Sequence, residues 1–315
     1  ASPTDTWIVE FKDGTTYENE PIKKAFFKIW LSDEVFKNTD SNIIQIDDYD
    51  DKERQLSSKF SGLNYEIKVY RNIVKPLIET NICPNFIKFL GSGENCSFED
   101  VSRMVSGTEP GKNANRTKTL YGNTISILKK KERKKITENY KPSDLSSFTK
   151  IVSHTDTVKY FKYNILVNEV IKPGTVDLRT FLRRDLDTKV NSIVIFQTLA
   201  ACYAMSCSKM LQNDLHLGNV YIEPLDSPIR MNYIYGGDLY TFETEYIAKV
   251  FDFDRAYVQR FGPNPFLEEE EDWTCDEYSQ CNEYIENLDA IKLMGGIFRR
   301  LETEHKDEIL NICIQ

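Results

Sequence analysis

The chain has 315 residues, a formal net charge of -9 and a hydrophobic fraction of 40%. That length suits one two-lobed catalytic domain or two small domains, and the hydrophobic fraction excludes a wholly disordered chain. The acidic balance argues against a general nucleic-acid binder, so we expect no nucleic-acid partner.

Cysteine usage and apolar runs predict the compartment. The cysteines are odd in number and form no C-x-x-C pair, which predicts reduced thiols rather than a disulfide framework. No uninterrupted apolar run approaches the roughly 18 residues that span a bilayer, and no basic-then-apolar leader opens the chain. We therefore expect a soluble, cytoplasmic protein whose reduced cysteines are Cys83, Cys96, Cys202, Cys207, Cys275, Cys281 and Cys313.

The first strong strand signal is the apolar run 24–31, which contains Lys28. A lysine inside an apolar strand is costly unless its charge is paired or meets a ligand. The structural alternative is a lysine that snorkels from an edge strand. Lys24 competes with Lys28 as the ligand-binding lysine of this strand.

A helix follows over residues 63–78, where apolar residues recur at helical spacing. Glu66 lies near its first turn, where an acid is favourable by up to about 1 kcal/mol through the helix dipole. Residues 94–150 are polar and rich in turn-forming residues, which predicts an insertion between two strands. Its basic run, Lys129 to Lys135, is predicted as a solvated helix face; the alternative is a docking site for an acidic partner or an anionic membrane surface.

The middle of the chain predicts a strand and a buried helix. The apolar segment 164–171 runs into Lys172-Pro173-Gly174, which indicates a strand followed by a connector. Residues 192–211 form the most apolar stretch, so we expect a helix packed in the core.

The motif with the clearest chemistry begins at Asp214, which is followed by Asn219 and then by apolar residues of a short strand. This spacing is that of a phosphotransferase catalytic loop. Residues 246–251 form a second apolar strand that ends in Asp252, and a carboxylate at a strand end is a good ligand for a hard cation. The alternative is that these residues cap turns.

Asp214-Leu215-His216-Leu217-Gly218-Asn219, together with Asp252-Phe253-Asp254, resembles the protein-kinase-like superfamily. This variant of the loop also occurs in aminoglycoside and choline phosphotransferases. The whole pattern, including the turn Cys83-Pro84-Asn85-Phe86, is most similar to the divergent serine/threonine kinases of large cytoplasmic DNA viruses, the poxvirus-type kinases and their relatives. The resemblance implies a bilobal α+β fold: a small antiparallel-sheet lobe over 1–170 and a mainly helical, shortened lobe over 171–315.

The resemblance also implies roles for the loop residues. Asp214 would take up or orient the acceptor hydroxyl, and Asn219 and Asp252 would hold the Mg²⁺ that bridges the phosphates of ATP. Asp254 would be a second metal contact or a brace, with a pair to Arg255 as its structural alternative. His216 stands where protein kinases usually have Lys or Arg, so it would hydrogen-bond, take up a proton near phosphate, or be structural.

Other roles implied by the resemblance lie outside that loop. Lys28 would bind the inner phosphates, with Glu66 holding the lysine. Buried Asp289 would brace the catalytic loop. The connector after the strand would be the hinge that holds adenine, through Glu169, Val170 and Ile171.

The sequence departs from the family pattern in three places. No G-x-G-x-x-G loop precedes the strand of Lys28, no A-P-E motif follows Asp252, and Asn213 replaces the arginine that reads activation-segment phosphorylation. We therefore expect an enzyme that is constitutively competent or governed by a partner.

Three functions fit these features. The first is a viral-type kinase that phosphorylates Ser or Thr of a protein substrate, in the host cytoplasm or virion. The second is a small-molecule kinase that acts on an amino alcohol or antibiotic, and whose acidic run, Glu268 to Asp272, lines a pocket for that cationic substrate. The third is a pseudokinase or binding module, against which the presence of Asp214, Asn219 and Asp252 argues.

Overall fold

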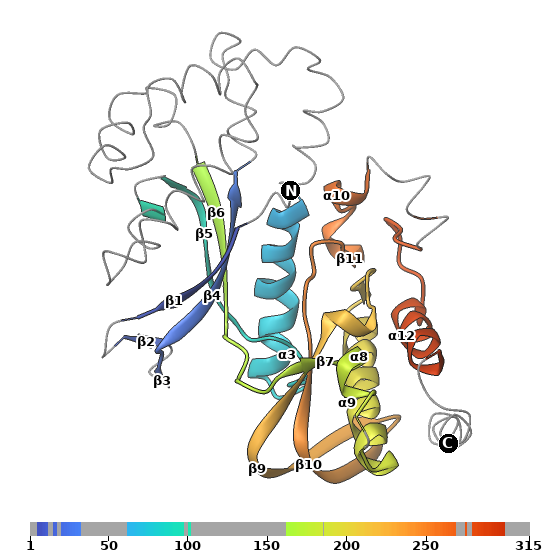
Figure 1. The fold of residues 1–315 in the computed structure, drawn as a ribbon. Helices are drawn as coiled ribbons and strands as arrows, with labels where there is room; N and C mark the ends of the chain where they lie inside the picture. The colour runs from blue at the N-terminus through green and yellow to red at the C-terminus, as the bar shows by residue number, and fades with distance from the viewer. Residues whose placement is uncertain are drawn as a thin grey trace. The chain divides into compact units, whose positions relative to one another are not determined.

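The computed structural model describes residues 5–11, 15–17, 20–32, 62–97, 100–101, 162–184, 186–268, 275 and 279–299. It is a mixed α/β structure with antiparallel sheets (Figure 1). The chain forms two units, residues 1–67 with 90–170 and residues 68–89 with 171–315. The lobes expected from the sequence, 1–170 and 171–315, would place residues 68–89 in the first unit. In the structure these residues belong to the second unit. Most of the expected insertion, including Lys129 to Lys135, lies outside the described residues.

The first unit is built on a four-stranded sheet. Its order is β1 (Asp5–Glu10), β4 (Lys24–Leu31), β6 (Lys162–Asn168) and β5 (Phe89–Ser97). A short hairpin of β2 (Thr16–Tyr17) and β3 (Glu20–Pro21) precedes β4. β4 pairs with a neighbour on each side, Lys28 lying opposite Thr6 on β1 and Leu166 on β6. The idea of a lysine snorkelling from an edge strand is therefore wrong, because β4 is an inner strand.

The helix that carries Glu66 runs over residues 62–79 and changes geometry midway. It contains a π-helical turn, η1 (Tyr70–Val74), followed by α3 (Lys75–Glu79). Pro76 has no backbone N–H, so it cannot donate to the carbonyl of Asn72 one turn earlier. Arg260 donates to that carbonyl at 2.7 Å instead. The proline therefore explains why a distant arginine is tied to this helix.

The second unit contains a long antiparallel hairpin. β9 (Val220–Tyr235) and β10 (Asp238–Val250) are joined by Gly236 and Gly237, both with positive φ. Such a pair suits a tight hairpin turn, because a side chain is strained at positive φ. The strand expected after Asn219 is thus much longer than predicted, and the described residues of this unit include a long β-hairpin where a mainly helical lobe was expected. The signal was present in the Gly-Gly pair between alternating apolar residues.

Short elements and helices complete this unit (Figure 1). β7 (Val176–Asp177) extends the hairpin sheet beside β9, and β8 (Met210–Leu211) pairs with β11 (Tyr257–Val258). The longest helix is α9 (Thr188–Cys207), which packs on β10. The remaining short helices are α8 (Leu178–Phe181), η3 (Leu217–Asn219), η4 (Gln259–Phe261), α10 (Pro265–Glu268) and α12 (Leu288–Phe298).

Helix α9 is also long and apolar enough to cross a bilayer, by length and composition alone. Its buried Gln197 accepts a hydrogen bond from the backbone N–H of Ala248 and donates to the carbonyl of Tyr246, both at 2.9 Å. Side-chain bonds to a neighbouring strand are what a core helix makes. The predicted core helix is therefore present, but it starts and ends four residues earlier than the apolar stretch 192–211 indicated, and Met210–Leu211 form β8 instead.

Asn85 joins three elements of the second unit. Its side-chain nitrogen donates to Gln197 at 3.1 Å and to the carbonyl of Ala248 at 2.9 Å. Its side-chain oxygen accepts from the hydroxyl of Tyr233 at 2.7 Å. Asn85 is fully buried, so none of these bonds can be replaced by bulk water. The asparagine fixes helix α9 against the hairpin.

We expect Asn85→Ala to lower the free energy of unfolding by roughly 2 to 4 kcal/mol, because it leaves a buried hydroxyl and a buried carbonyl without their partner and opens a cavity. Urea unfolding measures the change. The matched control is Asn232→Ala on the exposed side of β9, where less than about 0.5 kcal/mol is expected. Equal losses in the two variants would contradict the assignment of Asn85 as a structural hub.

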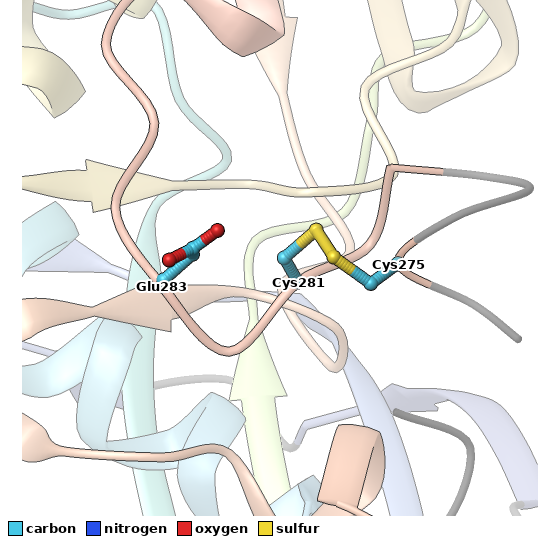
Figure 2. A group of neighbouring side chains, drawn as sticks. All are labelled: Cys275, Cys281 and Glu283. Carbon is cyan, nitrogen blue, oxygen red and sulfur yellow. A yellow bond between two sulfur atoms is a disulfide. The ribbon is translucent and has the colours of Figure 1, made fainter. Parts of the chain in front are cut away.

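The expectation that all seven cysteines are reduced is wrong for two of them. Cys275 and Cys281 form a disulfide, their Cα atoms 4.5 Å apart (Figure 2). A separation of six residues in the sequence did not indicate this pairing. Cys83, Cys96, Cys202 and Cys207 are free thiols, and Cys313 lies outside the described residues.

Candidate active site

The loop that carries Asp214 joins β8 to β9, and α12 holds its backbone. Asp289 of α12 accepts from the N–H of Gln212 at 2.6 Å and from the N–H of Asn213 at 3.0 Å. Lys292, one turn along the helix, donates to the carbonyl of Asn213 at 2.6 Å. Asn213 has a left-handed backbone (φ 72°), which asparagine tolerates better than most residues. The brace expected from Asp289 is present, and Lys292 is an addition to it.

Asp214 is held from both its backbone and its side chain. Its N–H donates to the side-chain oxygen of Gln212 at 2.8 Å, and its carbonyl accepts from the side chain of Asn219 at 3.0 Å. Oδ1 of Asp214 accepts from Nε2 of Gln280 at 2.9 Å. The side chain is half-buried, so the carboxylate is oriented but reachable from solvent.

The strands of the hairpin bring Asn219 and Asp252 to one end of the sheet. Val220 pairs with Val250 as the last rung of the β9–β10 ladder, and the N–H of Phe251 donates to the carbonyl of Asn219 at 3.2 Å. Asn219 thus directly precedes one strand, and Asp252 follows the end of the other. The side chain of Gln212 also donates to the carbonyl of Asp252 at 2.7 Å. One glutamine therefore connects the backbones of Asp214 and Asp252.

This donor set fits a hard divalent cation. The amide nitrogen of Asn219 is engaged by the carbonyl of Asp214, and no donor among the described residues reaches its side-chain oxygen. An amide oxygen and a carboxylate are the oxygen ligands that Mg²⁺ takes from proteins. Asp252 has φ 63°, an uncommon backbone conformation that clusters at functional sites. Asn219 and Asp252 are therefore the residues that could hold a metal.

The ring of Tyr221 lies beside this end of the sheet. It stacks on Phe251 with ring centroids 4.1 Å apart and an interplanar angle of 9°. Burial raises the pKa of the Tyr221 hydroxyl, and the negative charges of Asp252 and Asp177 raise it further. The tyrosine is therefore a neutral wall beside Asp252 at physiological pH.

His216 and Asp254 have structural contacts. Nδ1 of exposed His216 accepts from the N–H of Gly218 at 3.0 Å, which caps the short helix η3. A Cβ on Gly218 would lie 2.8 Å from the imidazole, so only glycine allows this cap. The backbone carbonyl of Asp254 accepts from Asn264 at 2.9 Å. The structural alternative for Asp254 was a pair with Arg255. In the structure, Arg255 donates to Gln280 and its guanidinium lies over the ring of Phe266.

In the first unit, Lys28 and Glu66 form an ion pair. Nζ of Lys28 lies 2.8 Å from Oε2 of Glu66, and the two residues are 9% and 1% exposed. Lys24 pairs instead with Glu10 in solvent. The pairing expected between Lys28 and Glu66 is thus present, which selects Lys28 over Lys24 as the buried lysine. Glu169, Val170 and Ile171 directly follow β6 and are half-buried.

Removing one member of this buried pair should lower the free energy of unfolding far more than removing the exposed Lys24. We expect Lys28→Met to lower the free energy of unfolding by about 3 to 5 kcal/mol, because it leaves the Glu66 charge buried. Lys24→Met, the matched control, should cost less than about 1 kcal/mol. Urea unfolding of Lys28→Met/Glu66→Leu should recover most of the loss. A double variant as unstable as Lys28→Met would show that the charge is not the cause.

Burial raises the pKa of Asp289 to about 6, while the N–H groups of Gln212 and Asn213 partly oppose the shift. The folded state therefore holds this proton more tightly than the unfolded state does. Its contribution to stability is complete below about pH 4 and is lost as the pH rises through about 6. The loss is on the order of 3 kcal/mol.

We accordingly expect the stability difference between the native chain and Asp289→Asn to change by about 3 kcal/mol in favour of the variant from pH 4 to pH 7. Urea unfolding at several pH values measures it. Asp238→Asn, at the exposed tip of the hairpin, serves as the control. Its free energy of unfolding should change with pH as that of the native chain does. If the free energy of unfolding of Asp289→Asn changed with pH as that of the native chain does, the raised pKa of Asp289 would be contradicted.

Sequence reasoning missed the glutamines of the site. Gln212 precedes the motif by two residues and Gln280 lies far along the chain, yet both contact Asp214. Gln212 adjoins the motif and could have been suspected as a brace. Nothing in the sequence pointed to Gln280. The acidic run expected at Glu268 to Asp272 lies outside the described residues, apart from Glu268 at the end of α10.

Two other features of the second unit carry no catalytic group. A cavity of about 510 Å³ lies between α9 and the hairpin, with Phe196, Tyr203 and Tyr240 in its mainly apolar wall. Asp214, Asn219 and Asp252 are absent from that wall. Ligand atoms of Cys275, Cys281 and Glu283 also lie within 4.8 Å of one another (Figure 2). Metal binding needs thiolates, whereas these sulfur atoms are bonded to each other.

Comparison with known proteins assigns no family to the chain. No protein-family model matches it, and no curated protein matches it. Among solved structures, a crystal structure described as a kinase domain is similar over 81% of this chain, with 11% sequence identity and a TM-score of 0.34. The aligned region covers 52% of that structure, so the chain spans about half its length.

Proposed function

We propose that this protein is an ATP-dependent phosphotransferase. The observation that carries the proposal is the grouping at one end of the β9–β10 hairpin. There, an oriented carboxylate (Asp214) shares a hydrogen-bonded frame with an available amide oxygen (Asn219) and a strand-end carboxylate (Asp252). Phosphoryl transfer needs positioned groups and neutralised charge more than covalent chemistry. These residues supply the positioned groups, and two of them could hold the cation that would neutralise the charge.

Each residue of the group has one task in this proposal. Asp214 accepts a hydrogen bond from the acceptor hydroxyl and takes its proton as the phosphoryl group arrives. Asn219 and Asp252 hold Mg²⁺, and Asp254 is either a further contact or a brace. When bound, the ion neutralises charge that develops on the phosphate oxygens.

In the first unit, Lys28 binds the inner phosphates of ATP and Glu66 keeps the lysine in place. The buried pair supports these roles, because a desolvated lysine held at a fixed position is suited to bind an anion. Glu169, Val170 and Ile171 supply backbone groups for adenine. His216 accepts from the N–H of Gly218 through Nδ1, so its assigned contribution is to shape the loop.

The finer proposal is a protein serine/threonine kinase of the viral type that acts in the cytoplasm or a virion. It rests on the sequence resemblance around Asp214 and Asp252 rather than on a contact in the structure. Asn213, which stands where many protein kinases have the arginine that reads activation-segment phosphorylation, supports a site governed without that modification. The basic run Lys129 to Lys135 remains a proposed contact for an acidic partner or an anionic membrane.

The test is transfer of label from radiolabelled ATP with Mg²⁺ to the chain itself, to a basic protein and to a panel of small amines. Label on Ser or Thr of a protein, abolished by a chelator, is expected. Label on a small amine alone would move the assignment to a small-molecule kinase. Nucleotide binding without any transfer would contradict the enzyme and favour a binding module.

A further inference from the structure

Gln280 links the candidate catalytic carboxylate of Asp214 to Arg255, both in the second unit. Its side-chain nitrogen donates to Oδ1 of Asp214 at 2.9 Å, and its side-chain oxygen accepts from Arg255. Gln280 is 5% exposed, so its amide sits in a site where water does not compete freely. An amide fixed at both ends limits the orientation of the carboxylate it contacts.

The backbone on both sides of Gln280 is tied to the same frame. The carbonyl of Ser279 accepts from Lys292 at 2.9 Å, and the carbonyl of Cys281 accepts from the side chain of Asn213 at 2.9 Å. The side-chain oxygen of Asn282 accepts from the N–H of Asn264 at 2.7 Å. Residues 279–282 thus carry one contact to Asp214 and further hydrogen bonds to Arg255, Lys292, Asn213 and Asn264.

The disulfide adds a covalent bond to this segment at Cys281. Cys281 follows Gln280 directly, and its sulfur is bonded to that of Cys275 (Figure 2). A crosslink over a short loop restricts the conformations open to the residues inside it. Gln280 is one of those residues.

We propose that the Cys275–Cys281 pair is a redox control of the candidate active site, acting through Gln280 as a positioning residue for Asp214. This inference rests on the proposed phosphotransferase function. In the disulfide form, Gln280 is held against Asp214 and the carboxylate is oriented for transfer. In the dithiol form the covalent restraint on Cys281 is lost, the contact of Gln280 to Asp214 is made less often and turnover falls.

The chemical step is a thiol–disulfide exchange with a dithiol reductant. The S–S bond between Cys275 and Cys281 breaks, and the reductant delivers two electrons and two protons to give two thiols. The reductant becomes a disulfide in turn, so electrons and atoms balance. In reducing compartments, protein disulfides are usually transient, catalytic or redox-sensing, and this pair suits the last role.

The experiment compares oxidised chain with chain reduced by dithiothreitol, using label transfer from ATP. Reduction should lower kcat roughly 3- to 30-fold with little change in the KM for ATP. Cys275→Ser/Cys281→Ser should resemble the reduced native chain whether or not reductant is present. Cys207→Ser is the matched control, since this exposed thiol is outside the pair, and it should respond to reduction as the native chain does.

Gln280→Ala tests whether the disulfide acts through the glutamine. Its kcat should be low in both redox states, so reduction should have no further effect. If reduction lowered kcat by the same factor in Gln280→Ala as in the native chain, the link through Gln280 would be wrong. An unchanged native kcat on reduction would overturn the redox control.

A measurement without turnover separates this inference from the proposed function. Amide hydrogen exchange should quicken on reduction at residues 279–283 and 212–214 and stay unchanged in β9. Unchanged exchange at both segments would overturn the redox control even in an active enzyme. Faster exchange in a chain that transfers no phosphate would leave the structural link standing and reject the phosphotransferase.

Discussion

Asp214→Asn should lower kcat for label transfer from ATP by about 10²- to 10⁴-fold, the usual contribution of a positioned general base. The substituted side chain has the same shape but cannot take a proton. Its amide oxygen can still accept from Gln280, and the backbone bonds of Asp214 to Gln212 and Asn219 do not involve the changed atoms. The fold and the affinity for Mg²⁺-ATP should therefore survive.

Two measurements accompany this variant. Urea unfolding should give a free energy within about 1 kcal/mol of the native chain, because the loop keeps its frame. Asp238→Asn, a carboxylate of the same type at the exposed hairpin tip, should retain full activity. Activity of Asp214→Asn within a factor of about three of the native chain would reject Asp214 as the catalytic carboxylate.

Asp252→Asn should lower kcat/KM by about 10²- to 10³-fold and raise the Mg²⁺ concentration needed for half-maximal activity. The change keeps an oxygen ligand but removes the negative charge that binds a hard cation. The left-handed backbone at this position is tolerated by asparagine as well as by aspartate, so little strain is added. A Mg²⁺ titration of label transfer measures both effects.

Asp254→Asn is the matched comparison for the metal site. Asp254 lies two residues further along, and its backbone carbonyl is bound by Asn264, a bond that the substitution leaves intact. A brace would leave the Mg²⁺ requirement unchanged, whereas a second metal contact would raise it as Asp252→Asn does. An unchanged Mg²⁺ requirement in Asp252→Asn itself would contradict the metal assignment.

Several features could be predicted because they depend on neighbours in the sequence. The spacing from Asp214 to Asn219 lies within one short loop, and the apolar pattern of residues 192–211 reports a buried helix directly. Lys28 stood out because a lysine in an apolar strand needs a partner. Asp289 stood out in the same way, as an acid on the buried face of a helix.

Other features required the tertiary structure. Segment 68–89 groups with the second unit through contacts such as that of Tyr70 with Phe253, whose ring centroids lie 5.1 Å apart. No local pattern predicts that aromatic pair. The disulfide was likewise unexpected, because cysteine spacing alone does not tell whether the chain folds back to bring two sulfur atoms together.

By itself, the sequence determined the composition class, the strand of Lys28, the buried helix near residues 192–211 and the loop that carries Asp214, because periodicity and short spacings act over a few residues. The tertiary structure alone decided that Gln212 joins the backbones of Asp214 and Asp252, and that Gln280 meets the carboxylate of Asp214. Those contacts join residues that are distant in the chain. They form only when the hairpin, α12 and residues 279–282 pack together and leave buried polar groups that must find partners.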